Sequence, residues 1–209
     1  MAPASSERGA IFTGARGRVI ARGDGPASDW NVANIITIVR ILLAPLFVWL
    51  LFADDHAGGP LRYLAALLFV VAIVTDSVDG RLARSRNLVT NLGILLDPIA
   101  DKVLTGAALV GLSLLGELPW WVTGLILLRE IGITVFRFAV LADRVVPASR
   151  GGKLKTVLQS VAITTALLPL QQVVGDWWNI VNTVLMSAAL VLTVVTGIDY
   201  LVQAYRRNR

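Results

Sequence analysis

The sequence predicts an all-α, polytopic membrane protein with six transmembrane helices and a short N-terminal amphipathic helix. Of its 209 residues, 56% are hydrophobic and 16% are charged, and the mean hydropathy is +0.71. A soluble protein of this composition would have too little polar surface to cover itself. The apolar segments are each near the roughly 20 residues that a bilayer core requires, and only helices or closed barrels satisfy the backbone there.

The N-terminal segment is polar and basic. Residues 1–29 carry four arginines among small residues and proline, and they contain no apolar run typical of a signal peptide. We expect them to form a flexible tail on the cytoplasmic side. At its end, Ser28 or Asp29 can cap the short amphipathic helix that leads into the first span.

Six apolar segments follow, and we expect residues 30–209 to form one transmembrane domain. Basic residues avoid the three loops that would face outward if the N-terminus is cytoplasmic, with Arg62 as the exception. This is the pattern of the positive-inside rule, and it places both termini on the cytoplasmic side of the cell membrane. The predicted spans cover approximately residues 35–52, 61–74 with an extension into the polar stretch that follows, 94–115, 118–142, 154–174 and 180–205.

The composition also excludes several functions. The chain has no cysteine, so it contains no disulfide, thiolate metal site or thiol nucleophile. Its net charge of +5 comes from residues at the ends of apolar segments rather than from a basic patch with interleaved aromatics. Nucleic acid is therefore not an expected partner. The tryptophan pairs at 120–121 and 177–178 are expected to anchor the outer membrane boundary.

Four aspartates stand between the second and third predicted spans. Asp76 and Asp79 are three residues apart, and Asp97 and Asp101 are four apart, so each pair shares one helical face. Two antiparallel helices could then bring all four carboxylates together. Such carboxylates repel one another unless hard divalent cations with oxygen ligands lie between them. The spacing predicts a two-metal centre, although ion pairs with nearby arginines and Lys102 are an alternative for any one acid.

Two residues beside the acids suit a phosphate group. Gly80 leaves the backbone next to Asp79 open to a close approach. Arg84 lies one turn further on, and an arginine can bind phosphate with two parallel hydrogen bonds. Together with the carboxylates, these residues predict a site for a pyrophosphate bridged by metal ions.

This stretch resembles the CDP-alcohol phosphotransferase family, whose signature is D-x2-D-G-x2-A-R-x8-G-x3-D-x3-D. The family is built from six transmembrane helices with a cytoplasm-facing site and is commonly dimeric, so the resemblance covers the whole chain. It implies two divalent ions, usually Mg²⁺ with Mn²⁺ as an alternative, bound by the four aspartates, and it implies that Asp101 is the general base. It further implies that CDP is held by Asn34, Thr37, Gly80, Arg84 and Thr90. The signature positions are Asp76, Asp79, Gly80, Ala83, Arg84, Gly93, Asp97 and Asp101.

Basic residues of the fourth and fifth spans are candidates for binding a second substrate. Arg129 and Arg137 lie two turns apart in the fourth span, and Lys153 and Lys155 begin the fifth. One interpretation is a pocket for an acceptor that carries its own phosphate. The alternative is structural: Glu130 could neutralise Arg129, and the lysines could be positive-inside anchors.

The R-E-I...R and A-S-x-x-G-K-x-K-T-x-x-Q stretches resemble the phosphatidylglycerophosphate synthases within that family. The resemblance implies CDP-diacylglycerol and sn-glycerol 3-phosphate as substrates. Phosphatidylinositol phosphate synthases and the family's cardiolipin synthases are the rival expectations. An ion-coupled carrier is a hypothesis of another class, but it would show repeat symmetry and carboxylates near mid-membrane. A structural scaffold would gain nothing from four clustered acids.

Overall fold

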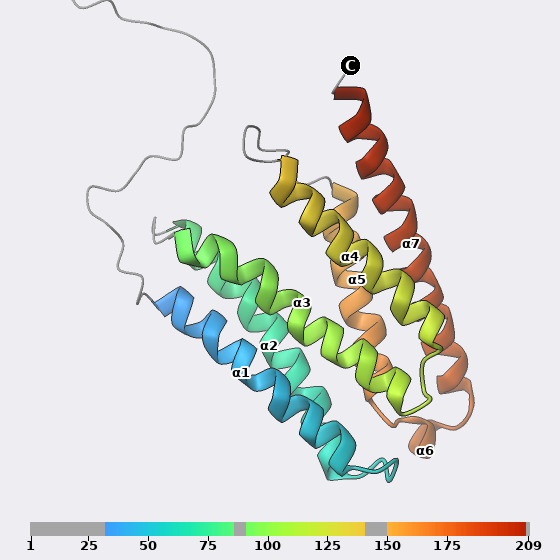
Figure 1. Ribbon diagram of the computed structural model, residues 1–209. Helices are drawn as coiled ribbons and strands as arrows, with labels where there is room; N and C mark the ends of the chain where they lie inside the picture. The colour runs from blue at the N-terminus through green and yellow to red at the C-terminus, as the bar shows by residue number, and fades with distance from the viewer. Residues whose placement is uncertain (1–31, 86–90, 141–149, 208–209) are drawn as a thin grey trace, which may run out of the picture.

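The computed structural model describes residues 32–85, 91–140 and 150–207, and these residues form seven α-helices and no strand. This confirms the all-α prediction (Figure 1). The predicted tail, residues 1–29, lies outside the described part of the chain. The helices are α1 (Val32–Ala53), α2 (Pro60–Ser85), α3 (Asn91–Leu114), α4 (Trp120–Val140), α5 (Arg150–Leu167), α6 (Gln171–Val174) and α7 (Trp177–Arg207).

The helix boundaries differ from the predicted ones in two places. The amphipathic lead and the first span form one continuous helix, α1, so the described residues contain no separate amphipathic helix. The fifth predicted span is too long, because α5 ends at Leu167 instead of residue 174. Pro169 lies two residues further on; it lacks a backbone N–H and disfavours helical geometry at the residue before it, Leu168. The chain then makes the short α6 and turns at Gly175, whose φ is 90°.

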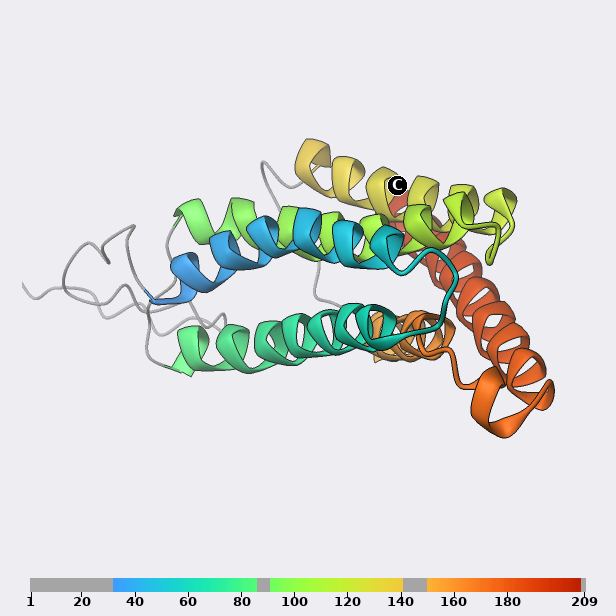
Figure 2. The same cartoon turned by 90° about the horizontal axis from the view of Figure 1, so that it is seen from below.

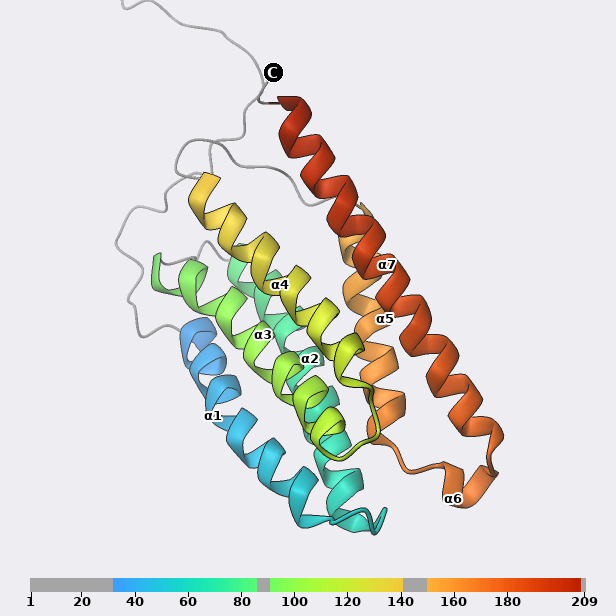
Figure 3. The ribbon, with the colours of Figure 1, turned by 45° about the vertical axis from the view of Figure 1, so that its right-hand side comes forward.

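The six long helices run alternately in opposite directions along the bundle (Figure 1). Seen from below, α1, α3 and α4 form one layer, and α2 and α5 lie beneath them (Figure 2). Helix α7 packs against α4 and α5 (Figure 3). This topology brings the end of α2, the start of α3, the end of α4 and the start of α5 to the same end of the molecule.

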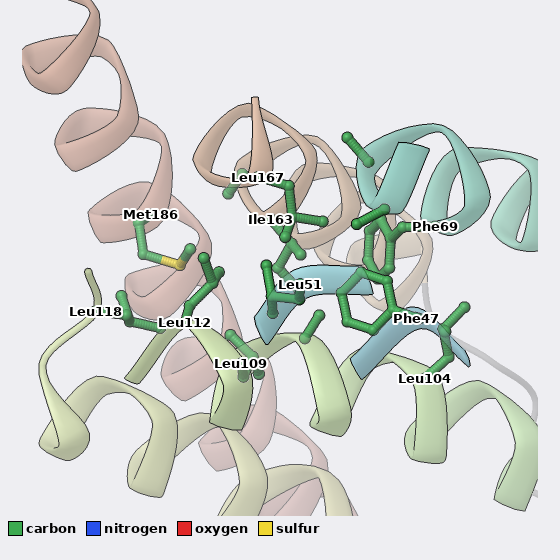
Figure 4. Close-up of a cluster of buried hydrophobic side chains, with 14 of the residues drawn as sticks. Phe47, Leu51, Phe69, Leu104, Leu109, Leu112, Leu118, Ile163, Leu167 and Met186 are labelled. Carbon is green, nitrogen blue, oxygen red and sulfur yellow. The ribbon is translucent and has the colours of Figure 1, made fainter. Parts of the chain in front are cut away.

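A continuous apolar core joins all six long helices, α1 to α5 and α7, and Figure 4 shows part of it. The rings of Phe47 and Phe69 lie 5.9 Å apart between α1 and α2. Helices α1 and α3 approach closely at Gly111, where an added Cβ would lie 2.6 Å from Cδ2 of the buried Leu51. Small residues at helix crossings permit this kind of contact in membrane proteins.

Arg62 holds the loops together at the opposite end of the bundle. Its side chain is buried and pairs with Glu117 of the α3–α4 loop. Its Nε donates to the carbonyl oxygen of Leu167 at 2.9 Å, which satisfies an end carbonyl of α5. The only basic residue near the predicted outward loops is thus neutralised inside the protein. Its position does not conflict with the predicted orientation.

Two segments in the described residues are long and apolar enough to cross a membrane, Asn34–Ala53 and Trp177–Gln203. Leu154–Leu167 is a shorter apolar helix. These segments are consistent with a membrane protein. Both segments belong to helices at the two ends of the sequence, α1 and α7.

Candidate active site

The structure places the four predicted acids at one end of the bundle. Asp76 and Asp79 lie in the C-terminal part of α2, and Asp97 and Asp101 lie in the N-terminal part of α3. The side chains of Asp76 and Asp101 are 41% and 44% exposed, so both are accessible to a ligand. The side chains of Asp79 and Asp97 lie outside the described set.

Helix α1 supplies a buried arginine to this cluster. Arg40 is 4% exposed, and its Nη1 pairs with Oδ1 of Asp76. Its Nε is buried and has no hydrogen-bond partner among the described residues. Asn34 and Thr37 precede Arg40 at intervals of three residues on the same helical face, and both are buried with interactions of their own. Arg40 therefore joins α1, the helix that also carries the predicted CDP-binding positions Asn34 and Thr37, to the acidic cluster.

For the remaining predicted site residues, the structure shows which helix carries each residue. Gly80 and Arg84 lie in α2, Arg137 lies in α4 and Lys153 lies in α5, while the description does not extend to their side chains. Thr90 lies outside the described residues altogether.

Glu130 is the centre of a charged cluster built by three helices. Its side chain is 12% exposed and pairs with Lys155 of α5. Nη1 of Arg129 lies 3.2 Å from Oε1 of Glu130, and Nζ of Lys102 lies 3.5 Å from its Oε2. Lys102 also lies 3.8 Å from Oδ2 of Asp101, so it connects the basic cluster to the acidic one. The pairing of Arg129 with Glu130 is confirmed, and Lys155 shares the same carboxylate.

Arg129 turns toward α7. Its Nη2 donates to Oγ1 of Thr196 at 3.1 Å. A Cβ added at Gly197 would lie 3.0 Å from Cγ of Arg129, so the arginine stem lies directly against the α7 backbone. This position fits a residue that supports Glu130 better than one that contacts a ligand.

A cavity of about 350 Å³ lies between α3, α4 and α5 and connects both clusters. Asp101, Lys102, Glu130 and Lys155 form its charged lining, and Gln159 adds a buried amide. The remaining lining is largely apolar, with hydroxyl groups from all three helices. A small molecule in this cavity would lie beside Asp101 and both lysines. The other lining residues are Ile99, Val103, Thr105, Gly106, Leu109, Leu127, Ile131, Thr134, Val135, Thr156 and Ser160.

The sequence model of the CDP-alcohol phosphatidyltransferase family matches residues 30–195. The chain belongs to this family. It is 48% identical over 182 residues to a protein of Mycobacterium tuberculosis named probable phosphatidylglycerophosphate synthase, covering 87% of this chain and 85% of that one.

Two further relatives carry the name CDP-diacylglycerol–glycerol-3-phosphate 3-phosphatidyltransferase. The protein of Rickettsia prowazekii is 38% identical over 176 residues, which cover 82% of this chain and 94% of the relative. The protein of Bacillus subtilis is 38% identical over 184 residues, which cover 82% and 93%. The chain is therefore a phosphatidyltransferase enzyme, and the alignments cover most of the length of these relatives.

The family uses divalent metal ions, and the described acids fit that chemistry in part. Asp76 and Asp101 offer accessible carboxylate oxygens from two neighbouring helices, the donor type that Mg²⁺ and Mn²⁺ prefer. Arg40 occupies only Oδ1 of Asp76. Among the described side chains, no three acidic or histidine residues form a complete metal cluster, and the other two predicted ligands are outside that set.

Sequence reasoning did not assign Lys102, Glu130 or Gln159 to the site. Lys102 follows Asp101 directly, and Glu130 follows Arg129, so both were visible as charged neighbours of predicted residues. Gln159 lies four residues after Lys155, which places it on the same face of α5. It is also the last residue of the A-S-x-x-G-K-x-K-T-x-x-Q stretch, and these two signals could have identified it.

Proposed function

We propose that this phosphatidyltransferase transfers the phosphatidyl group of CDP-diacylglycerol to sn-glycerol 3-phosphate, releasing CMP and forming phosphatidylglycerophosphate. The observation that carries the proposal is the cavity that joins Asp101 to Lys102 and Lys155. A general base beside two ammonium groups suits an acceptor that has both a hydroxyl group and a phosphate. Family membership and the names of the relatives support the same reaction.

Asp101 acts as the general base in this mechanism. Its carboxylate takes the proton of the acceptor hydroxyl while that oxygen attacks the phosphorus atom attached to the lipid. A bond forms between the acceptor oxygen and this phosphorus, and the bond from the phosphorus to the oxygen bridging to CMP breaks. A carboxylate is a weak base for an alcohol, so most of the acceleration comes from alignment and charge stabilisation.

The metal ligands proposed are Asp76, Asp79, Asp97 and Asp101, holding two Mg²⁺ ions. Bound there, the ions would neutralise the diphosphate and the charge that develops on it. Arg40 fixes Asp76 from the α1 side, and its buried charge limits the repulsion between the acids. The accessible carboxylates of α2 and α3 support this assignment.

The CDP group is assigned to residues of α1 and α2 and of the segment that follows α2. Asn34 and Thr37 are buried on α1 and precede Arg40, which pairs with Asp76. Gly80 gives the nucleotide a close approach to the α2 backbone. Arg84 and Thr90 complete the proposed set, with Arg84 directed to a phosphate group.

The acceptor phosphate is assigned to the basic side of the cavity. Lys155 and Lys102 line the cavity and share Glu130, which holds both ammonium groups in place. Arg137 and Lys153 are the further phosphate ligands proposed from the sequence. Arg129 acts through Glu130, since its guanidinium is also bonded to Thr196.

We expect the enzyme to cross the cell membrane six times, with the active site and both termini cytoplasmic, and to form a homodimer. Large apolar side chains are exposed on every long helix, as a lipid-facing bundle requires. The alternating directions of the six long helices and the distribution of basic residues support this topology. Examples of such exposed residues are Leu42, Leu67, Ile99, Leu128, Val157 and Ile180.

The proposed reaction is tested by CMP release from CDP-diacylglycerol in detergent with Mg²⁺. Glycerol 3-phosphate, inositol 1-phosphate and phosphatidylglycerol are compared as acceptors. Turnover confined to glycerol 3-phosphate is expected. Turnover only with inositol phosphate or phosphatidylglycerol would be compatible with the mechanism but would refute glycerol 3-phosphate as the acceptor. Solute transport into liposomes without CMP release would instead show a carrier.

A further inference from the structure

Gln159 is a buried polar residue of the cavity to which the mechanism above gives no task. It is 4% exposed, lies one turn after Lys155 on α5 and lines the same cavity. Its Oε1 is buried and has no hydrogen-bond partner among the described residues. Buried side-chain oxygens are nearly always hydrogen-bonded, and one that lacks a partner needs an explanation. A ligand in the cavity would provide one.

The other polar residues of the cavity lining are already engaged. The hydroxyl groups of Thr105, Thr134, Thr156 and Ser160 each donate to the carbonyl oxygen four residues earlier in their own helix. The charged groups pair with one another around Glu130. Among the described lining residues, the Oε1 of Gln159 is therefore a buried oxygen that can still accept a hydrogen bond from an uncharged group of a ligand, such as a hydroxyl.

We propose that Gln159 binds the non-reacting hydroxyl group of the acceptor polyol and thereby selects acceptors that carry it. In glycerol 3-phosphate this is the secondary hydroxyl at carbon 2. The inference rests on the proposed function, which directs the phosphate to Lys102 and Lys155 and the reacting hydroxyl to Asp101. The middle carbon then lies between these groups, and Gln159 follows Lys155 on the same helical face.

A hydroxyl group suits this amide particularly well. It can donate to Oε1, and it can also accept from the amide nitrogen. A site with a buried polar group rejects a ligand that lacks the matching hydroxyl, because the protein group then stays unpaired. Gln159 therefore acts on acceptor choice and not on the transfer step itself.

The test compares glycerol 3-phosphate with 3-hydroxypropyl phosphate, which has the reacting hydroxyl and the phosphate but no hydroxyl at the middle carbon. The full-length enzyme in detergent is assayed for CMP release, and kcat/KM is measured for both acceptors. The wild-type enzyme is expected to prefer glycerol 3-phosphate by about 10-fold or more. In Gln159→Met, kcat/KM is expected to fall about 10-fold for glycerol 3-phosphate and to stay unchanged for the analogue.

Ser160→Ala is the matched control, because Ser160 is the adjacent lining residue and its hydroxyl donates to its own helix. It should retain the wild-type preference. An equal loss for both acceptors in Gln159→Met would show a structural role and overturn the inference. If that variant does not fold, a wild-type enzyme that uses both acceptors equally well would also overturn it. Absence of any turnover with glycerol 3-phosphate would refute the proposed function itself.

Discussion

Lys155→Met tests whether the basic cluster binds the acceptor or only stabilises the fold. Lys155 is buried and pairs with Glu130. In the variant, Glu130 keeps Arg129 and Lys102 as partners, at 3.2 Å and 3.5 Å. The loss of stability should therefore stay below the roughly 3–5 kcal/mol of a buried charge left without a partner.

The effect on the acceptor should be large. A hydrogen bond to a charged group contributes about 1.5–3 kcal/mol, which corresponds to roughly 10- to 150-fold in kcat/KM. We expect this loss for glycerol 3-phosphate, with the KM for CDP-diacylglycerol unchanged. Both constants are measured from CMP release while one substrate is varied and the other is saturating. The melting temperature of the purified protein in detergent is recorded in parallel.

Arg62→Met is the matched control, since Arg62 is an equally buried cation with a carboxylate partner at the far end of the bundle. It should lower the melting temperature without changing the KM for glycerol 3-phosphate. The reasoning would be refuted if Lys155→Met behaved in the same way. Lys155 would then be a structural counter-ion of Glu130 alone.

Three other outcomes are expected. Gly111→Ala should destabilise the protein, because the new methyl group would lie 2.6 Å from the buried Leu51; overpacking costs about 1–3 kcal/mol, and the melting temperature should fall by about 2–4 °C per kcal/mol. Gly124→Ala is the control, because a Cβ added there has no heavy atom within 4 Å, and it should not destabilise the protein. Equal melting temperatures for the two variants would contradict the close contact between α1 and α3. Asp101→Asn should lower kcat by at least about 100-fold in a folded protein; retained turnover would exclude it as the base. Removal of divalent ions with EDTA should abolish CMP release and added Mg²⁺ should restore it, whereas full activity in EDTA would rule out the metal centre.

The predicted helices are largely those observed, because long apolar segments have few alternatives to helix. The boundaries were less accurate where a local residue decides them. Hydropathy extended the fifth span to residue 174, whereas Pro169 follows the end of α5 at Leu167. The mean hydropathy of a sequence window does not register that proline lacks a backbone N–H. The loss of that one hydrogen-bond donor is enough to interrupt a helix.

The candidate site was predicted best where its residues are close in sequence. The spacing of Asp76, Asp79, Asp97 and Asp101 already placed each pair on one helical face. Arg40 was visible at the same spacing from Thr37, yet its pairing with Asp76 spans 36 positions. The distribution of charges left two interpretations of Arg129 and Lys155, and the structure shows that Glu130 binds both.

The sequence by itself determined the helical class, the family signature and the face that each helix would present. Only the tertiary structure decided which of those faces meet. Lys102, Glu130 and Lys155 come from α3, α4 and α5, and only the structure shows that the oxygen of Gln159 is buried with no partner among the described residues. Periodicity fixes the direction of a side chain around its own helix axis, whereas its neighbour depends on how several helices pack at once.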